Sequence, residues 1–188
     1  MSALSGHRFF NDETERRTWQ NPTAILTLIG LKRGFTFVDV GCGPGFFTLP
    51  AAKLVGETGT VYGVDANAAA IRNLREKAIE NGFDNVYATI GAAENTIVGE
   101  ALADIVFFGI VLHDFNDPAK VLKNARRMLK PTGTLVDLDW KKEPMQLGPP
   151  LPIRFSEKKA TSLVRQAGFK IEVVRDVGPY HYLITASV

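Results

Sequence analysis

The sequence predicts an α/β fold with a doubly wound, mostly parallel seven-stranded sheet and a C-terminal antiparallel hairpin. Three observations support this prediction. Apolar, β-branched runs alternate with helical patterns, glycines stand where several of these runs end, and two strand-like runs close the sequence. Alternating strands and helices are typical of a parallel sheet with right-handed crossovers. An antiparallel last strand is common on such sheets.

The first half of the chain contains three predicted strands with helices between them. Residues 2–20 are polar and charged, which predicts a loose start followed by a helical arm, and the aromatic residues of this segment either pack on the domain or cover a ligand pocket. These aromatic residues are Phe9, Phe10 and Trp19. The expected strands are 37–40, 60–64 and 86–90, and the expected helices are 22–29, 47–55 and 68–80. Proline at the first turn and glycines just past the last turn support the helix bounds.

The second half continues the alternation and then changes pattern. Residues 104–108 are nearly all apolar, which is typical of a central strand covered on both faces. The later expected elements are a helix over 119–129, a turn over 130–133, a strand over 134–140, a helix over 157–167, and strands over 171–174 and 182–186. The proline-rich stretch 141–153 predicts an irregular loop over the carboxyl edge of the sheet, a candidate lid.

Length and composition fit one domain. A chain of 188 residues that is 45% hydrophobic and 22% charged can bury a sizeable core and is short for two domains. We therefore expect a single domain over residues 1–188 with an N-terminal helical arm. A net charge of +2 gives no reason to propose nucleic acid or an anionic membrane as a partner.

The single cysteine and the absence of long apolar runs bear on the compartment. With only Cys42, the chain cannot form an internal disulfide, which fits a reducing environment. Residues 1–10 lack an apolar signal-peptide core, and no run approaches the roughly 18 apolar residues of a membrane span. We expect a cytoplasmic protein without membrane segments, and the oligomeric state stays open.

Three glycines follow the first predicted strand, at Gly41, Gly43 and Gly45. Glycine permits positive φ and lets a ligand approach the main chain, and a strand-to-helix turn lies at the edge where open α/β sheets bind ligands. Phe46 occupies the place of the third glycine of a dinucleotide fingerprint, so the loop is a poor phosphate cradle. The alternatives are a turn that only connects strand to helix and, for Cys42, a reactive thiol instead of a merely small side chain.

Asp65 ends the second predicted strand, at the same edge of the sheet as the glycines. An acidic residue at this distance after a glycine turn is placed to accept hydrogen bonds from two ribose hydroxyls. The alternative is a helix N-cap, which is a common role of aspartate.

Taken together, these motifs resemble those of the class I S-adenosylmethionine (SAM)-dependent methyltransferases, which have a Rossmann-like fold. The similarity is greatest to the group that includes ubiquinone/menaquinone biosynthesis and arsenite methyltransferases, and it runs from about Phe35 to the C-terminus. It rests on segments 38–45, 64–65, 104–107, 111–113, 117–118 and 129–135. Arsenite methyltransferases depend on several cysteines, so the one cysteine of this chain makes that chemistry improbable.

The resemblance implies that SAM lies across the sheet edge and leaves as S-adenosylhomocysteine. The main chain of the glycine loop would meet the methionine part, Asp65 the ribose, and the residues near Gly109 the sulfonium. The predicted cofactor-binding residues are Asp39, Gly41, Cys42, Gly43, Asp65, Ala66, Ala93 and Gly109. Ala92 stands where the family often has an acidic residue for adenine, so backbone groups near Ala93, or Glu94, would take that role.

The expected reaction is methyl transfer to a small-molecule acceptor. If the acceptor is a hydroxyl or an acidic carbon, a general base helps, and His113 is the first candidate. Asp114, Tyr180 and His181 follow it as candidates. His113 could instead cap or pack against the next helix. His113, Asp114 and Asp117 are metal-ligand types, but we predict no metal site.

Two other functions are compatible with parts of the sequence. One is a SAM-binding protein without catalysis, such as a regulatory or partner subunit. The other is an NAD(P)-dependent oxidoreductase, which predicts a glycine at position 46, where this chain has phenylalanine.

Overall fold

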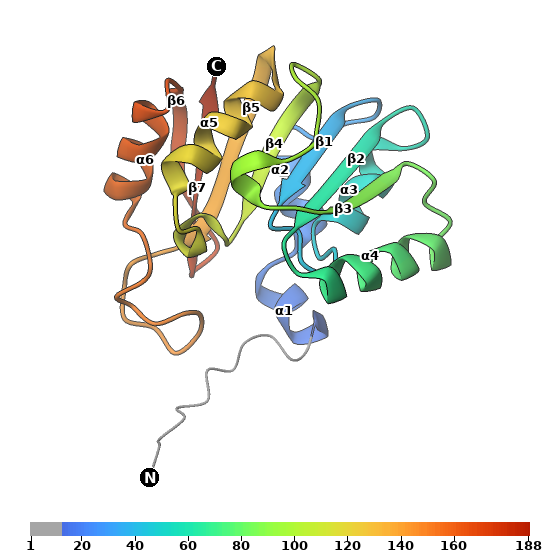
Figure 1. The fold of residues 1–188 in the computed structure, drawn as a ribbon. Coiled ribbons are helices and arrows are strands. Elements are labelled where there is room, and N and C mark those ends of the chain that lie inside the picture. The colour runs from blue at the N-terminus through green and yellow to red at the C-terminus, as the bar shows by residue number, and fades with distance from the viewer. Residues whose placement is uncertain (1–12) are drawn as a thin grey trace.

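A seven-stranded mixed sheet forms the centre of the computed structural model, which describes residues 13–188 (Figure 1). The strand order is β3-β2-β1-β4-β5-β7-β6. The pairs from β3 to β5 are parallel, whereas β7 is antiparallel to both β5 and β6. The predicted fold class is confirmed. The expectations for Phe9 and Phe10 lie outside the described residues.

The observed elements lie close to the predicted ranges. The strands are β1 (Thr36–Val40), β2 (Thr60–Asp65), β3 (Val86–Ile90), β4 (Ala103–Gly109), β5 (Leu129–Trp140), β6 (Lys170–Val177) and β7 (His181–Ser187). The helices are α1 (Glu13–Trp19), α2 (Pro22–Leu28), α3 (Thr48–Val55), α4 (Ala68–Glu80), α5 (Pro118–Met128) and α6 (Glu157–Gln166). Two short 3-10 turns are η1 (Ala93–Asn95) and η2 (Leu112–Asp114). The helix starts agree with local chemistry, because Asn21, Asn67, Asp117 and Ser156 each accept a backbone N–H of the helix that follows.

The start of β5 differs from the prediction. The sequence predicts a turn over residues 130–133, but β5 already begins at Leu129. Ala103 pairs with Leu129 and Ile105 pairs with Thr134, so a step of two residues on β4 faces five on β5, and the excess forms a bulge. A side chain at Gly133 would come within 2.8 Å of the Ala103 carbonyl oxygen, so glycine permits this close approach.

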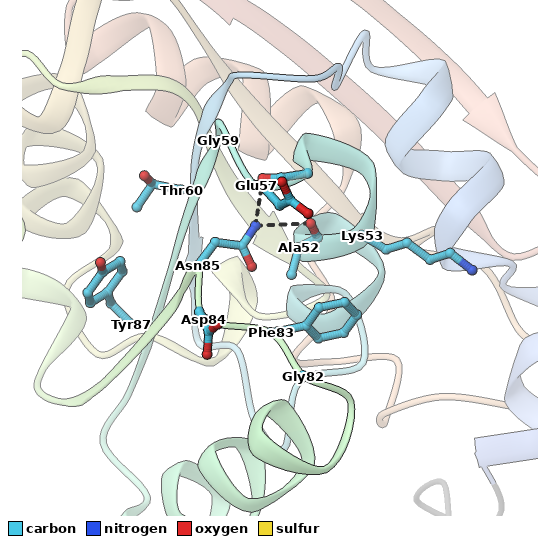
Figure 2. A pocket seen from close by; sticks show the side chains of 11 residues that line it. Ala52, Lys53, Glu57, Gly59, Thr60, Gly82, Phe83, Asp84, Asn85 and Tyr87 are labelled. Carbon is cyan, nitrogen blue, oxygen red and sulfur yellow. Dashed lines mark hydrogen bonds between the residues drawn. The ribbon is translucent and has the colours of Figure 1, made fainter.

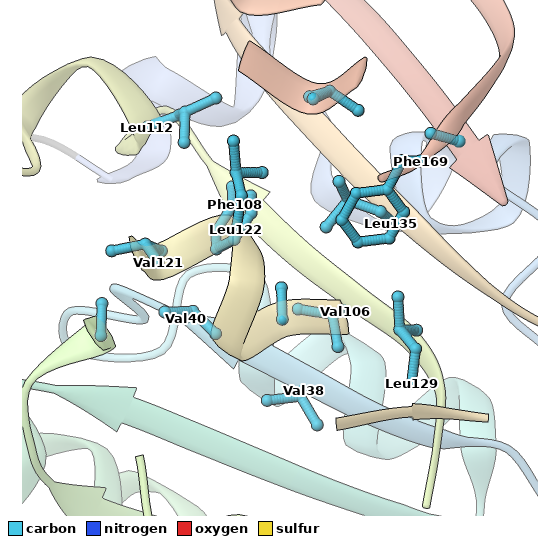
Figure 3. Close-up of a cluster of buried hydrophobic side chains, with 14 of the residues drawn as sticks. Val38, Val40, Val106, Phe108, Leu112, Val121, Leu122, Leu129, Leu135 and Phe169 are labelled. Carbon is cyan, nitrogen blue, oxygen red and sulfur yellow. The ribbon is translucent and has the colours of Figure 1, made fainter. Parts of the chain in front are cut away.

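Helices cover both faces of the sheet and bury apolar side chains on each. In Figure 1, α5 and α6 lie in front of the sheet, and α2 and α3 lie behind it. Figure 3 shows the front cluster, in which Phe108 and Leu122 are fully buried. On the other face the rings of Phe47 and Phe107 pack with centroids 4.8 Å apart. Strands buried on both faces explain the nearly continuous apolar runs of the sequence.

Two segments lie beyond the edge at which the parallel strands end: α1 and the irregular loop 141–156 between β5 and α6 (Figure 1). The ring of Trp19 stacks on His181 at 5.7 Å and meets Tyr180 edge to face at 5.8 Å. Aromatic contacts therefore hold the end of α1 on the start of β7. No helix within residues 13–188 combines the length and apolar character that a bilayer crossing requires.

Candidate functional site

The glycine bend after β1 is attached to the end of β2 through its main chain. The Gly41 and Cys42 amides both donate to the Val64 carbonyl, at 2.7 and 3.1 Å. All three glycines of the bend have positive φ, with values of 75°, 53° and 96°. A side chain at Gly41 would lie 2.5 Å from Val111, whereas a Cβ at Gly43 would meet no atom within 4 Å. Gly41 is therefore needed for packing, and Gly43 leaves space that a ligand can use.

Asp65 contacts the glycine bend directly. Its Oδ2 accepts the Gly43 amide at 2.8 Å, and its Oδ1 accepts the Asn67 amide, also at 2.8 Å. Because Asn67 caps α4, the N-cap alternative for Asp65 does not apply. A carboxylate oxygen can accept more than one hydrogen bond, so Asp65 retains capacity for ligand hydroxyls.

Asp39 lies under the bend, with 2% of its surface exposed. Thr48 donates a hydrogen bond from Oγ1 to Asp39 Oδ2 at 2.6 Å. Burial, the largest cause, raises the pKa of Asp39 to about 7, and the nearby charge of Asp65 adds to the rise, while the Thr48 hydrogen bond and Arg16 oppose it. Asp39 therefore binds a proton at a higher pH than an ordinary aspartate.

Arg16 brings a cation from α1 to the same place. Its guanidinium carbon lies 3.7 Å from the centre of the Phe46 ring, and its Nε donates to Gln20 at 2.7 Å. Burial, the largest cause, lowers the pKa of Arg16 to about 10, so the side chain stays charged at neutral pH. Nothing in the sequence distinguishes this arginine from the other charged residues of its segment.

The other predicted cofactor residues occupy the same edge in different environments. Cys42 is buried, and burial, the largest cause, raises the pKa of its thiol, which fits a small side chain rather than a nucleophile. Ala66 is exposed directly after β2, and Ala93 is buried with its carbonyl accepting Asn124 Nδ2 at 2.9 Å. At Gly109 a side chain would lie 2.9 Å from the Phe47 ring, so packing requires glycine there.

His113 lies across the edge from the glycine bend, at the end of β4, with 2% of its side chain exposed. Its Nδ1 lies 2.7 Å from Asp139 Oδ1, and its Nε2 lies 3.3 Å from Asp114 Oδ1. Burial opposes the charged form, but the hydrogen bond to Asp139 and the charges of both aspartates outweigh it and raise the pKa of His113. The structure therefore places two carboxylates against one buried imidazole.

Arg154 fixes the proline-rich loop from inside. Its exposed fraction is 3%, and its guanidinium donates to four backbone carbonyls between 2.7 and 3.3 Å. These carbonyls belong to Pro149, Lys141, Glu143 and Leu147. The loop lies at the carboxyl edge as predicted, and the sequence did not reveal that one arginine holds it together.

A cavity of about 550 Å³ lies at the opposite edge of the sheet, where β2 and β3 begin (Figure 2). Lys53, Thr60 and Tyr87 are among its lining residues, and none of the predicted site residues is. Asn85 donates to the Ala52 and Gly56 carbonyls at 3.1 and 2.9 Å, so it satisfies the end of α3. This cavity is separate from the candidate site.

Sequence reasoning missed Arg16, Asp139 and Arg154. For Asp139 a signal existed, because Asp137 and Asp139 are two carboxylates in an otherwise apolar strand. Among residues 13–188, no group of three or more His, Cys, Asp and Glu side chains is arranged to hold a metal ion.

Comparison with known proteins identifies related domains. A family model described as a methyltransferase domain matches residues 31–168. Demethylmenaquinone methyltransferase of Anoxybacillus flavithermus is 31% identical over 121 residues, which are 64% of this chain and 50% of that protein. A ubiquinone/menaquinone biosynthesis C-methyltransferase of Klebsiella pneumoniae is 32% identical over 127 residues, covering 67% of this chain and 50% of that protein. The matches thus span about half the length of these curated relatives.

Solved structures also match over most of the chain. A SAM-dependent methyltransferase from Aquifex aeolicus superposes with a TM-score of 0.88 at 31% identity, covering 92% of both chains. The similarity therefore includes the edge that carries the glycine bend and the segments beyond β5.

Proposed function

The chain belongs to the class I SAM-dependent methyltransferases, and from this premise we propose that it transfers a methyl group from SAM to a small-molecule acceptor. The main support for the proposal is the contact between the glycine bend after β1 and the carboxylate of Asp65 at the end of β2. The Gly43 amide donates to Asp65, and the space above Gly43 is open. A side chain at Gly43 would fill the place proposed for the ligand.

We propose that each of the predicted cofactor-binding residues contacts a different part of SAM. Gly41, Cys42 and Gly43 offer main-chain groups to the methionine part, and Asp65 offers carboxylate oxygens to the ribose. Ala66 and Ala93 flank the adenine, and Gly109 ends the strand beneath the reacting centre. Asp39 beneath the bend and Arg16 over the Phe46 ring provide a carboxyl and a cation, at which the amino and carboxylate groups of the methionine part are expected.

When bound, SAM supplies an activated methyl group on a sulfonium, which leaves as a neutral thioether. The protein then contributes alignment and the exclusion of water. The ordered loop held by Arg154 and the position of α1 beyond the strand ends support that role. His113 lies between Asp139 and Asp114, and we propose that this group of three residues accepts the proton of the acceptor.

The relatives point to a class of acceptor. Two of them are named for menaquinone or ubiquinone biosynthesis, so we propose a quinol-like small molecule as the acceptor. We also propose a cytoplasmic location, which the single buried cysteine supports. The single-domain organisation stays a prediction.

Calorimetry with SAM, S-adenosylhomocysteine and NADH tests the cofactor class. We expect binding of both adenosyl ligands, no binding of NADH, and at least tenfold weaker SAM binding in Asp65→Ala, because two backbone donors and the ribose lose their acceptor. Asp84→Ala, an exposed aspartate of the opposite edge, is the matched control and should bind SAM normally. If the wild type binds neither adenosyl ligand, the proposal fails.

Labelled SAM separates an enzyme from a binding protein. We expect transfer of labelled methyl to a component of a fractionated cell extract, with Asp65→Ala inactive at the same SAM concentration. SAM binding without transfer to any fraction would instead favour a non-catalytic subunit.

A further inference from the structure

We propose that Asp114 takes a proton from the methyl acceptor and that His113 and Asp139 position it, so the acceptor is a molecule with an aromatic or enolic hydroxyl. This inference rests on the proposed methyl transfer. In the step, a lone pair of the acceptor forms the bond to the methyl carbon, and the carbon–sulfur bond breaks with its electron pair moving to sulfur. The acceptor proton moves to the Asp114 carboxylate.

Exposure decides which member of the group can meet the acceptor. The side chains of His113 and Asp139 are 2% and 1% exposed, whereas that of Asp114 is 60% exposed. Both ring nitrogens of His113 already face carboxylates. A base must reach the proton that it removes, and of these three residues only Asp114 presents free carboxylate surface.

The buried pair lies against Asp114. Asp139 accepts the Trp140 amide at 2.7 Å as well as His113, so its position is set by the backbone of β5. His113 in turn places Nε2 3.3 Å from Asp114 Oδ1. When it is protonated, the imidazole attracts Asp114 as an ion pair, and the buried Asp139 sets the position of that imidazole, which favours proton transfer in a defined geometry.

The charged and titratable groups around the imidazole favour this direction of transfer. They are Asp114 on η2, Asp139 on β5 and Arg154 before α6. Asp139 also acts on Asp137 of β5, and both of these carboxyls act on Tyr182 of β7. Partial burial, the largest cause, and the charge of Asp139 raise the pKa of Asp114, while His113 opposes the rise. A carboxyl with a raised pKa is a better base.

The buried carboxyl of Asp137 suggests that the surroundings of Asp139 have a functional role besides packing. It is fully buried, and neither carboxyl oxygen has a hydrogen-bond partner within residues 13–188; the same holds for the Tyr182 hydroxyl. Burial, the largest cause, and Asp139 raise the pKa of Asp137 well above its ordinary range. Unsatisfied groups of this kind are rare in protein interiors and concentrate at functional sites.

The group formed by Asp114, His113 and Asp139, called the relay below, lies beside the proposed cofactor region. Val111, two residues before His113, occupies the space above Gly41. Ile110, directly after β4, has φ of 65°, a left-handed conformation that β-branched residues rarely adopt. Such backbone strain clusters at active sites. The short segment from Ile110 to Asp114 therefore joins the glycine bend to the carboxylate.

Nuclear magnetic resonance can test the relay without an acceptor. The chain has 3 histidines, so the ring signals of His113 can be assigned with His113→Asn. We expect the titration midpoint of His113 to fall in Asp139→Asn and to fall by a smaller amount in Asp114→Asn. A midpoint that both variants leave unchanged would overturn the relay.

Methyl transfer tests the catalytic role, with catechol and 1,4-dihydroxynaphthalene as probe acceptors. General-base catalysis contributes about 100-fold or more, so we expect Asp114→Asn to lower kcat by that factor with an unchanged KM for SAM. The acidic limb of the pH–kcat profile should disappear in this variant. Asp117→Asn removes a charge three residues away and can still cap α5, so it should behave as the wild type.

The outcomes separate this inference from the proposed function. A wild type that binds SAM but methylates neither probe would contradict the inference that the acceptor carries a hydroxyl. An Asp114→Asn variant with full activity and an unchanged pH profile would contradict the inference that Asp114 is the base. Failure of the wild type to bind SAM would instead contradict the proposed function.

Discussion

The two ends of the carboxyl edge are built in different ways. At the β1–β2 end, the proposed cofactor half consists mainly of backbone: glycines with positive φ and amides that donate to Val64 and Asp65. At the β4–β5 end, the proposed acceptor half depends on side chains, namely the His113–Asp139 pair and Arg154. The Gly43–Asp65 contact joins positions 22 apart and the His113–Asp139 contact joins positions 26 apart, so the two ends differ in the kind of group that they use and not in sequence separation. A shared cofactor with a variable acceptor suits this division.

The largest expected effect concerns the acceptor half. Arg154→Ala should lower the free energy of unfolding by about 4 kcal/mol, because four backbone carbonyls, of which that of Pro149 is buried, lose a charged donor. Urea denaturation measures this loss, and calorimetry should show SAM affinity within about twofold of the wild type. Arg154→Lys keeps the positive charge but lacks the planar guanidinium, so its free energy of unfolding should lie between those of the wild type and Arg154→Ala.

An exposed arginine serves as the control for Arg154. Arg175→Ala on β6 should change stability by less than about 0.5 kcal/mol. If Arg154→Ala abolishes SAM binding while the protein stays folded, the two halves are not independent and the comparison fails.

Gly43→Ala tests the cofactor half. Because a Cβ there meets no protein atom within 4 Å, we expect little change in packing, but the methyl group would occupy ligand space and weaken SAM binding about 100-fold. Gly82→Ala is the matched control, since Gly82 also has positive φ and open surroundings but lies at the opposite edge. Equal SAM affinity in both variants would show that the bend does not face the cofactor.

The pH dependence of stability tests the buried carboxyl beneath the bend. The pKa of Asp39 is raised from 3.8 to about 7, so its contribution to stability is complete below pH 3.8 and is lost progressively as the pH rises from there through 7. The substitution Asp39→Asn should reduce the downward slope of unfolding free energy over this pH range, by at most about 1.4 kcal/mol per pH unit. Denaturant titrations at several pH values measure the slope, and exposed Asp84→Asn should not alter it.

The last prediction concerns the thiol in the bend. Burial raises the pKa of Cys42, so iodoacetamide at pH 8 should alkylate the native protein at least 100-fold more slowly than the protein in urea. The single cysteine makes the measurement unambiguous. Rapid native alkylation would mean that side-chain chemistry also operates in the cofactor half.

The fold and the proposed cofactor half could be predicted from the sequence because both depend on patterns within short stretches of the chain. Apolar runs and glycines define the strands and their ends, and Gly41 to Asp65 form one strand–helix–strand unit. The acceptor half is predictable only in part. The sequence singles out His113, but its partner Asp139 lies on another strand, and Arg154 follows a loop without a periodic pattern. The bulge at the start of β5 escapes prediction because the proline and glycine of residues 130–133 are equally typical of a turn.

The position of β7 determines the order in which the sheet can be completed during synthesis. β6 emerges from the ribosome first, yet within residues 13–188 its sheet neighbour is β7 alone. Until His181–Ser187 inserts, the outer edge of β5 has no partner and Trp19 lacks the ring of His181 on which it stacks. A nascent chain paused before β7 would therefore expose apolar strand edges, and helper proteins that shield such edges should associate with it at that stage.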